Sequence, residues 1–294
     1  MKKKICLIFM ALFLMGTTPS KAVDIQTLLS QIGFNVFAQK DAKTEITKVI
    51  EKQQKYANKK NYKKLKELYS STYSNNDGIT FEDYIESLKT TADLHTKMTY
   101  NTTINSINIS GNYATVEAVD TAEGTTKTGY ENIEGKGILT SNAKAIYYFK
   151  KENGDWKIDS EYVYSEKTAL KYGVTKEIEI NLDAPECIKA GTEYNIKISA
   201  NLPEGSGLIA SIATENIQYP HTKAEDIFRP MKRDGELERV VTSNTDGKNE
   251  IAFASVGIAK AVLNSEAKID FVINGVAFIS SRVNVIPNKV KANE

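Results

Sequence analysis

Three acids in strand-like segments are the side chains best suited to do chemistry. They are Glu117, Asp120 and Asp159. A carboxyl group that points into an apolar interior has a raised pKa, because burial disfavours its charged form, and such a group suits general acid–base catalysis. Solvated or ion-paired acids are the commoner alternative in strands. The three acids are therefore catalytic candidates, and no nucleophile or metal site accompanies them.

Tyrosine is unusually frequent, with 15 residues in the chain. Its hydroxyl group can bind a ligand, whereas its ring also makes it a common half-buried strand residue. Strand alternation over residues 155–165 places Trp156 and Tyr162 on one face, with Asp159 and Glu161 on the other. The predicted ligand pocket comprises Tyr100, Tyr113, Tyr147, Trp156 and Tyr162. The alternative is that these aromatic residues only build the strands.

Metal and cofactor chemistry finds little support in the sequence. The histidines are His95 and His221, and two isolated histidines with one mature cysteine do not make a zinc site. Phosphate-loop and Rossmann glycine patterns and the Gly-x-Ser-x-Gly motif are absent. We therefore expect no metal site and no cofactor. Nine lysines between Lys43 and Lys66 suggest the solvated face of helices or, alternatively, a docking face for anionic polymers.

The first residues have the pattern of a secretory signal peptide. Lys2–Lys4 are followed by an apolar run, Ile5–Met15, and by Ser20-Lys21-Ala22. About eleven apolar residues are too few to cross a bilayer core of ~30 Å as a helix. We expect cleavage after Ala22 and a periplasmic or secreted protein with no membrane span.

The mature chain is nearly balanced in charge. Without residues 1–22 it carries 34 basic and 37 acidic side chains, which predicts no general attraction to nucleic acid. Cys187 is then the single cysteine, so no intramolecular disulfide can form. Stability must come from ordinary hydrophobic cores.

Helical periodicity dominates the first part of the mature chain. Residues 23–40 are predicted to be an arm or a short helix, and residues 289–294 a polar tail. Apolar residues at spacings of three and four predict helices from Asp41 to about Ala57, from Tyr62 to Tyr73 and from Phe81 to Ala92. Thr80 and Asp83 resemble the N-cap and first turn of the third helix.

After His95 the period changes to that of strands. Strands are predicted at 98–109, 113–121, 143–151 and 155–165, and Glu123–Gly137 as an irregular strand or a loop. The Asn153-Gly154 pair between two alternating runs predicts a tight hairpin. Helices followed by a strand meander indicate an α+β domain, which we place at residues 41–172.

The remaining chain lacks the helical period. Seven short strand-like runs, with turns at Asp246-Gly247 and Asn274-Gly275, predict an all-β, immunoglobulin-like or fibronectin type III-like sandwich at residues 174–288. Glu215–Asp234 is predicted to be a long crossover loop.

The segment Gly154-Asp155-Trp156-Lys157-Ile158-Asp159, together with the order of helices and strands, resembles the nuclear transport factor 2-like (SnoaL-like) superfamily over residues 41–172. The resemblance implies a cone, in which a curved antiparallel sheet wraps three helices and leaves a pocket. Members include isomerases, dehydratases, hydrolases and non-catalytic binding proteins. In the ketosteroid isomerase-like members an Asp base works opposite a Tyr and a protonated Asp. A homodimer through the sheet is a further expectation.

Two functions remain open from the sequence. The first is an exported, non-catalytic protein that binds a small ligand or an envelope protein. The second is a lyase or isomerase that uses an acid and tyrosines inside the cone. Two titratable groups that converge inside the cone would favour the second function.

Overall fold

The computed structural model describes residues 25–201, 206–218, 228–230, 235–263 and 268–288, with side chains from residue 41 onwards apart from that of Leu263. The chain divides into two compact units, Met1–Ala42 and Lys43–Glu294. The candidate site lies within the second unit. The predicted signal peptide, the polar tail and most of the predicted crossover loop fall outside the described residues.

The described chain is mostly β-sheet with few helices. The helices are α1 (Ile25–Asn58), α2 (Tyr62–Lys66), α3 (Phe81–Leu94) and the 3₁₀ helix η1 (Val174–Glu177). The second predicted helix is wrong after Lys66, because Tyr69–Asn75 forms strand β1, parallel to β5. Its Tyr-Ser-Ser-Thr-Tyr sequence has low helix propensity and suits a half-buried strand. The predicted cap of α3 is confirmed, because Thr80 and Asp83 form a capping box.

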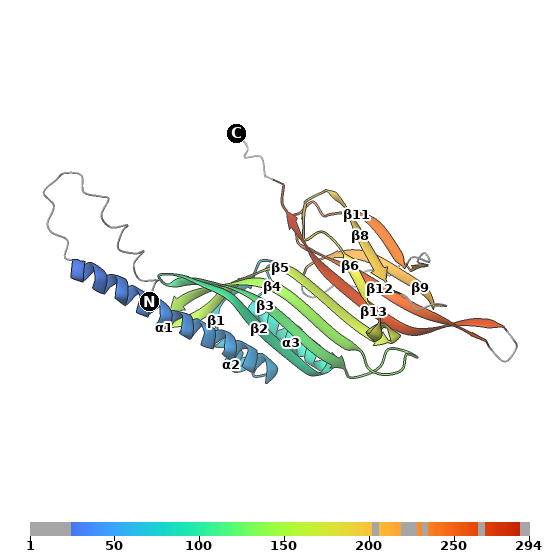
Figure 1. Cartoon of the computed structure of the whole chain (residues 1–294), viewed down its shortest axis with the longest axis horizontal. Helices are drawn as coiled ribbons and strands as arrows, with labels where there is room; N and C mark the ends of the chain where they lie inside the picture. Colours follow the sequence, from blue (N-terminus) through green and yellow to red (C-terminus); the bar gives the residue numbers. More distant parts are fainter. Residues whose placement is uncertain (1–24, 202–205, 219–227, 231–234, 264–267, 289–294) are drawn as a thin grey trace, which may run out of the picture. The chain divides into compact units, whose positions relative to one another are not determined.

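One large, mostly antiparallel sheet extends through most of the second unit (Figure 1). Its main path is β10-β9-β12-β13-β5-β4-β3-β2, while β1 pairs with β5 and β7 pairs with β13. A three-stranded sheet has the order β11-β8-β6. The strands are β1 (Tyr69–Asn75), β2 (His95–Ser110), β3 (Tyr113–Thr126), β4 (Ile138–Glu152), β5 (Asp155–Gly173), β6 (Ile180–Asp183), β7 (Cys187–Lys189), β8 (Glu193–Ala200), β9 (Ser206–Asn216), β10 (Arg229–Pro230), β11 (Glu236–Thr242), β12 (Glu250–Leu263) and β13 (Ile269–Ile286).

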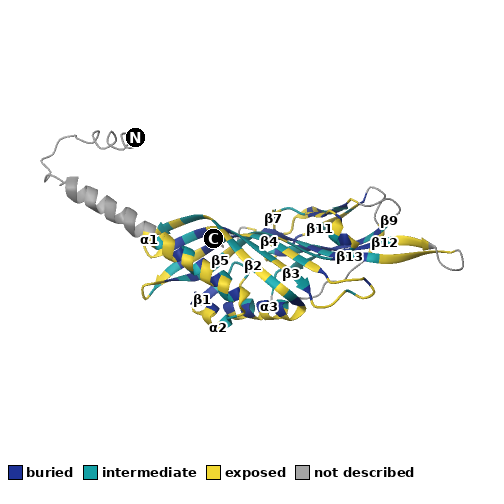
Figure 2. Ribbon diagram, turned by 60° about the horizontal axis from the view of Figure 1, so that its bottom comes forward, coloured by how far each residue is buried: buried dark blue, intermediate teal, exposed yellow. Residues whose placement is uncertain are grey.

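Strands β2 to β5 present one face to the helices (Figure 2). Ala114, Val116 and Ala118 alternate along β3 and are buried on this inner face. The helices contribute a buried stripe to the same core, which comprises Ile46, Ile50, Leu65, Phe81, Ile85 and Leu88. The opposite, outer face of β3 carries the exposed Tyr113 and Glu117.

The smaller sheet shares a second core with the C-terminal part of the large one. Tyr194, Ile196 and Ile198 of β8 are buried together with residues of β6, β9, β12 and β13. This arrangement is a packing of two sheets, but the predicted immunoglobulin-like topology is not confirmed. The reason is that β13 does not stay within a closed sandwich: it pairs with β5 from Gly275↔Gly173 to Ser281↔Lys167.

The domain boundary predicted near Gly173 remains a prediction, and the sheet is continuous across it. Gly173 has a φ of 59°, and a Cβ there would lie 2.1 Å from the carbonyl oxygen of Asn274. Glycine is therefore required where β5 meets β13. The turn predicted at Asn274-Gly275 is wrong, because β13 continues through it. The register shifts by one residue there, between Ile258↔Gly275 and Ala259↔Ile273, as in a β-bulge.

A buried ion pair joins the loop after β1 to strand β13. The Arg282 guanidinium donates two hydrogen bonds to the Asp77 carboxylate, at 2.9 and 2.7 Å. The two side chains are only 2% and 3% exposed. Asn249 donates a third hydrogen bond to Asp77, at 2.8 Å, and Arg282 also donates to Asn284, at 2.8 Å. The two parts of the sheet are thus tied by polar contacts as well as by strand pairing.

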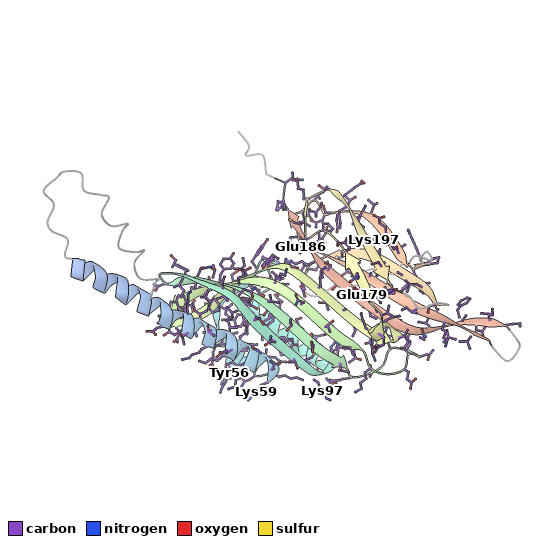
Figure 3. The ribbon with its side chains drawn as sticks, viewed as in Figure 1. Tyr56, Lys59, Lys97, Glu179, Glu186 and Lys197 are labelled. Atoms are coloured by element: carbon purple, nitrogen blue, oxygen red, sulfur yellow. The ribbon has the colours of Figure 1, made fainter. Side chains whose placement is uncertain are left out.

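The lysine-rich segment lies at the surface. All nine lysines from Lys43 to Lys66 are exposed. Lys59, at the end of the α1 region, and Lys97, in β2, are labelled in Figure 3 and are likewise exposed. Both interpretations of this segment, a solvated face and a docking face for anionic polymers, require exposed lysines, and both remain predictions.

Candidate active site

The β4–β5 hairpin sets the positions of the inner side chains. Its two-residue turn has positive φ at both residues, 51° at Asn153 and 91° at Gly154, as the Asn-Gly pair predicts. Trp156 and Ile158 are buried on the inner face of β5, and Phe149 lies opposite Ile158. Up to this point the simple alternation of the sequence holds.

A β-bulge at Asp159 then reverses the alternation. Tyr148 pairs with Ser160 whereas Phe149 pairs with Ile158, so Asp159 is the extra residue. A one-residue shift moves every following side chain to the other face. Glu161 consequently lies opposite Tyr147 on the inner face, and Tyr162 lies outside. The assignment of these two residues by alternation alone was wrong.

Asp120 is the first carboxyl group of the site. Thr102 donates a hydrogen bond to its Oδ1 at 2.5 Å, and Tyr147 donates to its Oδ2 at 2.8 Å. Burial raises the pKa of Asp120, although both hydrogen bonds stabilise the ionised form and act in the opposite direction. Asp120 thus has the setting predicted for a catalytic acid in the interior.

Glu161 is the second carboxyl group, and the sequence analysis missed it. Tyr73 donates a hydrogen bond to its Oε2 at 3.0 Å. Burial, and next the negative charge of Asp120, raise the pKa of Glu161 to about 8. No glycine marks the bulge that turns Glu161 inward. The one signal available was an acid within a tyrosine-rich strand.

The two carboxyl groups influence each other and titrate as a pair. A negative charge on Asp120 disfavours one on Glu161, so near neutral pH the pair retains a proton. Asp120 accepts two hydrogen bonds that favour its ionised form, whereas the pKa of Glu161 is raised to about 8. Two carboxyl groups with raised pKa values thus face the same tyrosine-lined interior, and carboxyl groups in such a setting can serve as base and acid in proton transfer.

Phenol groups surround the carboxyl pair. Tyr69 and Tyr73 stack edge to face at 4.8 Å between ring centroids, and Tyr69 hydrogen-bonds Tyr84. Burial first, and then the charges of Glu161 and Asp120, raise the pKa of Tyr147. Gln53 donates to the Tyr69 hydroxyl group at 2.8 Å, and its own Oε1 is buried without a hydrogen-bond partner among the described residues. The interior therefore holds several neutral donors and one open acceptor.

The other predicted site residues are divided between the two faces. Tyr100, Tyr147 and Trp156 face the interior, and Trp156 Nε1 is buried without a described partner. Tyr113 and Tyr162 lie on the outer face and are 67% and 40% exposed.

The two other acids predicted as catalytic candidates lie away from the pair. Glu117 is exposed on the outer face of the sheet. Asp159 is partly exposed on the bulge; burial alone would raise its pKa, but hydrogen bonds from Lys150 and Ser70 hold the pKa below its ordinary value.

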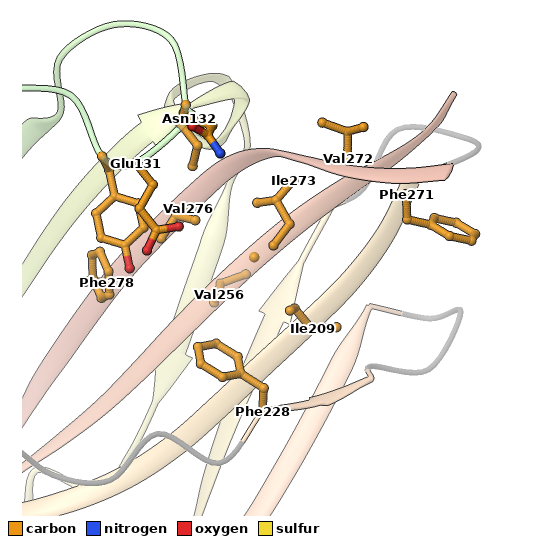
Figure 4. Close-up of a pocket in the computed structure, with 13 residues that line it drawn as sticks. Glu131, Asn132, Ile209, Phe228, Val256, Phe271, Val272, Ile273, Val276 and Phe278 are labelled. Atoms are coloured by element: carbon orange, nitrogen blue, oxygen red, sulfur yellow. The ribbon is translucent and has the colours of Figure 1, made fainter. Parts of the chain in front are cut away.

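A separate cavity of about 590 Å³ lies on β9, β12 and β13 (Figure 4). Its walls are mainly apolar and include Ile209, Val256, Ile273, Val276 and Phe278. Glu131 and Asn132, from the loop between β3 and β4, supply polar groups at one side. This size and composition are typical of sites for small ligands.

Two further features are absent from the described residues. No group of three or more His, Cys, Asp or Glu side chains among them could hold a metal ion. None of the helices in the described ranges is long and apolar enough to cross a membrane.

Comparison with known proteins gives similarities over less than half of the chain. No protein-family model matches, and no curated protein matches. Among solved structures, the chain is similar to a protein of Novosphingobium aromaticivorans that carries the name of a scytalone dehydratase, with 17% identity and a TM-score of 0.36, over 44% of this chain and 86% of that one. A type 2 hexachlorocyclohexane dehydrochlorinase (LinA) has 12% identity and a TM-score of 0.36, over 42% and 85%. A conserved protein of Planctomyces limnophilus has 12% identity and a TM-score of 0.36, over 42% and 94%.

Proposed function

We propose that the protein is an enzyme of the isomerase or lyase kind that transfers a proton on a small carbonyl compound. The supporting observation is that Asp120 and Glu161 both face the interior of the α+β region, where Tyr147 donates a hydrogen bond to Asp120 and Tyr73 donates one to Glu161. Taking two carboxyl groups out of water into one interior is unfavourable. Perturbed pairs of this kind concentrate at functional sites, although ion-pair networks also perturb pKa values.

The proposed step uses the two groups in different roles. The Asp120 carboxylate removes a proton from the carbon beside a carbonyl group; the electron pair of the C–H bond forms a C=C bond, and the π pair of the C=O bond moves to the carbonyl oxygen. The protonated Glu161 donates a hydrogen bond to that oxygen, with a neighbouring phenol as a second donor. Return of the proton to another carbon completes an isomerisation, whereas loss of a β-substituent completes an elimination.

Exchange of substrate protons with solvent tests this proposal. We expect the wild-type protein to exchange α-protons of at least one compound in a panel of ketones in D₂O, measured by ¹H NMR. Asp120→Asn is expected to slow that exchange about 100- to 10 000-fold, which is the usual contribution of a general base to the rate. Glu117→Gln, an acid on the outer face of the same strand, is the matched control and should exchange as wild type. Equal rates for wild type and Asp120→Asn would rule out the proposed role.

A second candidate function is the binding of a small apolar ligand, and the cavity on β9, β12 and β13 supports it. We expect Val276→Trp, which fills this cavity, to weaken binding of a neutral fluorescent apolar probe at least about tenfold. Val240→Trp, at a 60% exposed position of β11, is the control. Equal affinity in both variants would show that the probe binds elsewhere.

We also propose that the protein is exported after removal of residues 1–22, and that residues 41–172 belong to the nuclear transport factor 2-like superfamily. The charged and apolar pattern of Lys2–Met15 supports export. The helices followed by a strand meander, with Trp156 in its last hairpin, support the superfamily. The intact mass of the secreted protein tests the cleavage site.

A further inference from the structure

The cavity on β9, β12 and β13 has a floor of three residues that lie side by side across the strands. Gly257 of β12 pairs with Ile209 of β9 and with Val276 of β13, so the three residues share one face of the sheet, and all three line the cavity. A Cβ atom at Gly257 would lie 3.1 Å from Cγ1 of Ile209, closer than side chains normally pack. Glycine inside a strand often marks the close approach of a ligand. Here it leaves a trough between two aliphatic side chains.

Apolar side chains on the same face lengthen this trough along β13. Phe278 lies two residues beyond Val276 in one direction. In the other direction Ile273 lies opposite Ala259, which is two residues along β12 from Gly257. A strand rises about 3.3 Å per residue, so the trough from Ile273 to Phe278 is on the order of 15 Å long. An apolar trough of this length suits an extended alkyl chain.

Glu131 stands at one side of the cavity, in the loop between β3 and β4. Among the described residues that line the cavity, it is the one charged side chain. Its carboxylate makes no ion pair and no hydrogen bond with another described residue. Figure 4 shows the Glu131 side chain extending toward Val276. An unpaired carboxylate beside an apolar cavity attracts a cation and repels an anion.

The backbone holds Glu131 in a conformation that favours glycine. The N–H of Ile133 donates a hydrogen bond to the carbonyl oxygen of Tyr130 at 2.9 Å and closes a tight turn around Glu131. Glu131 has a φ of 46°, in the left-handed region that residues with a side chain seldom adopt. Strain of this kind clusters at ligand sites, where the side chain is needed. The carboxyl group is therefore the feature that glutamate brings to this turn.

Two aromatic rings accompany Glu131 in the cavity wall. Tyr130 and Phe278 both line the cavity, and their ring centroids lie 5.4 Å apart with the ring planes at 62°. The face of an aromatic ring attracts an ammonium group, and quaternary ammonium ligands are recognised by rings in this way. A carboxylate beside two rings thus suits a cationic head group.

We propose that the cavity binds an amphiphilic organic cation, with its alkyl chain in the trough and its ammonium group beside Glu131 and the rings of Tyr130 and Phe278. Glu131 is exposed, so the ammonium group can keep part of its hydration while the chain is buried. This inference rests on the second candidate function, the binding of a small apolar ligand in the same cavity. It adds the charge of that ligand, and it does not involve the carboxyl pair of Asp120 and Glu161.

Displacement of a neutral fluorescent apolar probe from the full chain tests the inference. The competitors have equal alkyl chains and different head groups: decyltrimethylammonium, decan-1-ol and decanoate. We expect the ammonium compound to bind at least about tenfold more tightly than decanoate, because the cavity carries a single negative charge. Glu131→Gln should weaken binding of the ammonium compound at least about fivefold and leave that of decan-1-ol unchanged. Glu131→Lys should reverse the preference and favour decanoate.

Two further variants control the experiment. Glu134→Gln removes an exposed acid of the same loop that does not line the cavity, and it should bind all three competitors as wild type. Glu131→Gly fits the left-handed backbone, so it gives the same readout as Glu131→Gln without straining the turn. Unchanged binding of decan-1-ol shows in each variant that the trough is intact.

The competitors separate a failure of this inference from a failure of the function on which it rests. If Val276→Trp leaves the binding of decan-1-ol unchanged, the second candidate function is wrong and the inference is wrong with it. If decan-1-ol binds in the cavity but the ammonium compound and decanoate bind equally, the function stands and the proposed charge of the ligand is wrong. Full affinity of Glu131→Gly and Glu131→Gln for the ammonium compound leads to the same conclusion.

Discussion

Replacing Asp77 by alanine is expected to destabilise the protein by about 3–5 kcal/mol, because it leaves the Arg282 charge buried without its partner. Arg282 is 2% exposed and cannot regain its hydration without opening the structure. Urea unfolding, followed by tryptophan fluorescence, measures the loss. The effect is expected to reach both parts of the sheet, since Asp77 follows β1 and Arg282 lies in β13.

Two comparisons isolate the buried pair. Glu82→Ala removes the exposed ion pair between Glu82 and Lys66, whose side chains are 71% and 66% exposed, and should change the stability far less than Asp77→Ala does. The double variant Asp77→Leu with Arg282→Met removes both charges and should recover much of the loss, since apolar groups often replace a buried pair without penalty. If Asp77→Ala unfolds like Glu82→Ala, the pair does not hold the sheet together.

The stability of the protein should fall as the pH rises from about 5 to 9, and Glu161→Gln should remove much of that fall. The pKa of Glu161 is about 8 in the folded protein, above its ordinary value of 4.5. The contribution of Glu161 to the free energy of unfolding is thus fully present at a pH below its ordinary pKa, and it is lost as the pH rises through 8. Since each pH unit between the two values is worth about 1.4 kcal/mol, the contribution is on the order of 5 kcal/mol.

Urea unfolding at a series of pH values measures this dependence. Glu86→Gln, at a side chain that is 56% exposed, serves as the control and should keep the wild-type profile. Asp120→Asn removes a negative charge that raises the pKa of Glu161. In this variant we therefore expect a smaller loss of stability between pH 5 and pH 7 than in the wild type. A wild-type profile that is flat between pH 6 and 9 would contradict the raised pKa.

Local sequence signals predicted the elements whose structure is set locally. The Asn153-Gly154 turn and the Thr80 cap follow from backbone geometry and hydrogen bonding within a few residues. Tyr69–Asn75 was assigned to a helix because its partner β5 is almost 90 residues away. Asn274-Gly275 has the composition of a turn, but the pairing of β13 with β12 makes it an irregularity within one strand.

Only part of the candidate site could be predicted from the sequence, for a related reason. Asp120 and Tyr147 follow the regular alternation of their strands and face inward as predicted. Glu161 lies beyond the bulge at Asp159, where Lys150 and Ser70 bind the carboxylate of the extra residue. Period-two patterns carry no information about such an insertion. The same bulge moved Tyr162 from the predicted pocket to the outer face.

The pairing of β5 with β13 has a consequence for the order in which the chain can fold. During synthesis the N-terminal part emerges first, and its strands can pair as soon as they are complete. The last part of strand β5, from Lys167 to Gly173, however, waits for a partner that begins at Ile269, whereas its first part pairs with β1. Until then it presents an open edge, which is prone to pair with other chains. A chaperone that covers β5, or rapid completion of the last strand, would therefore decide the yield of folded protein. A chain that stops before Ile269 would aggregate.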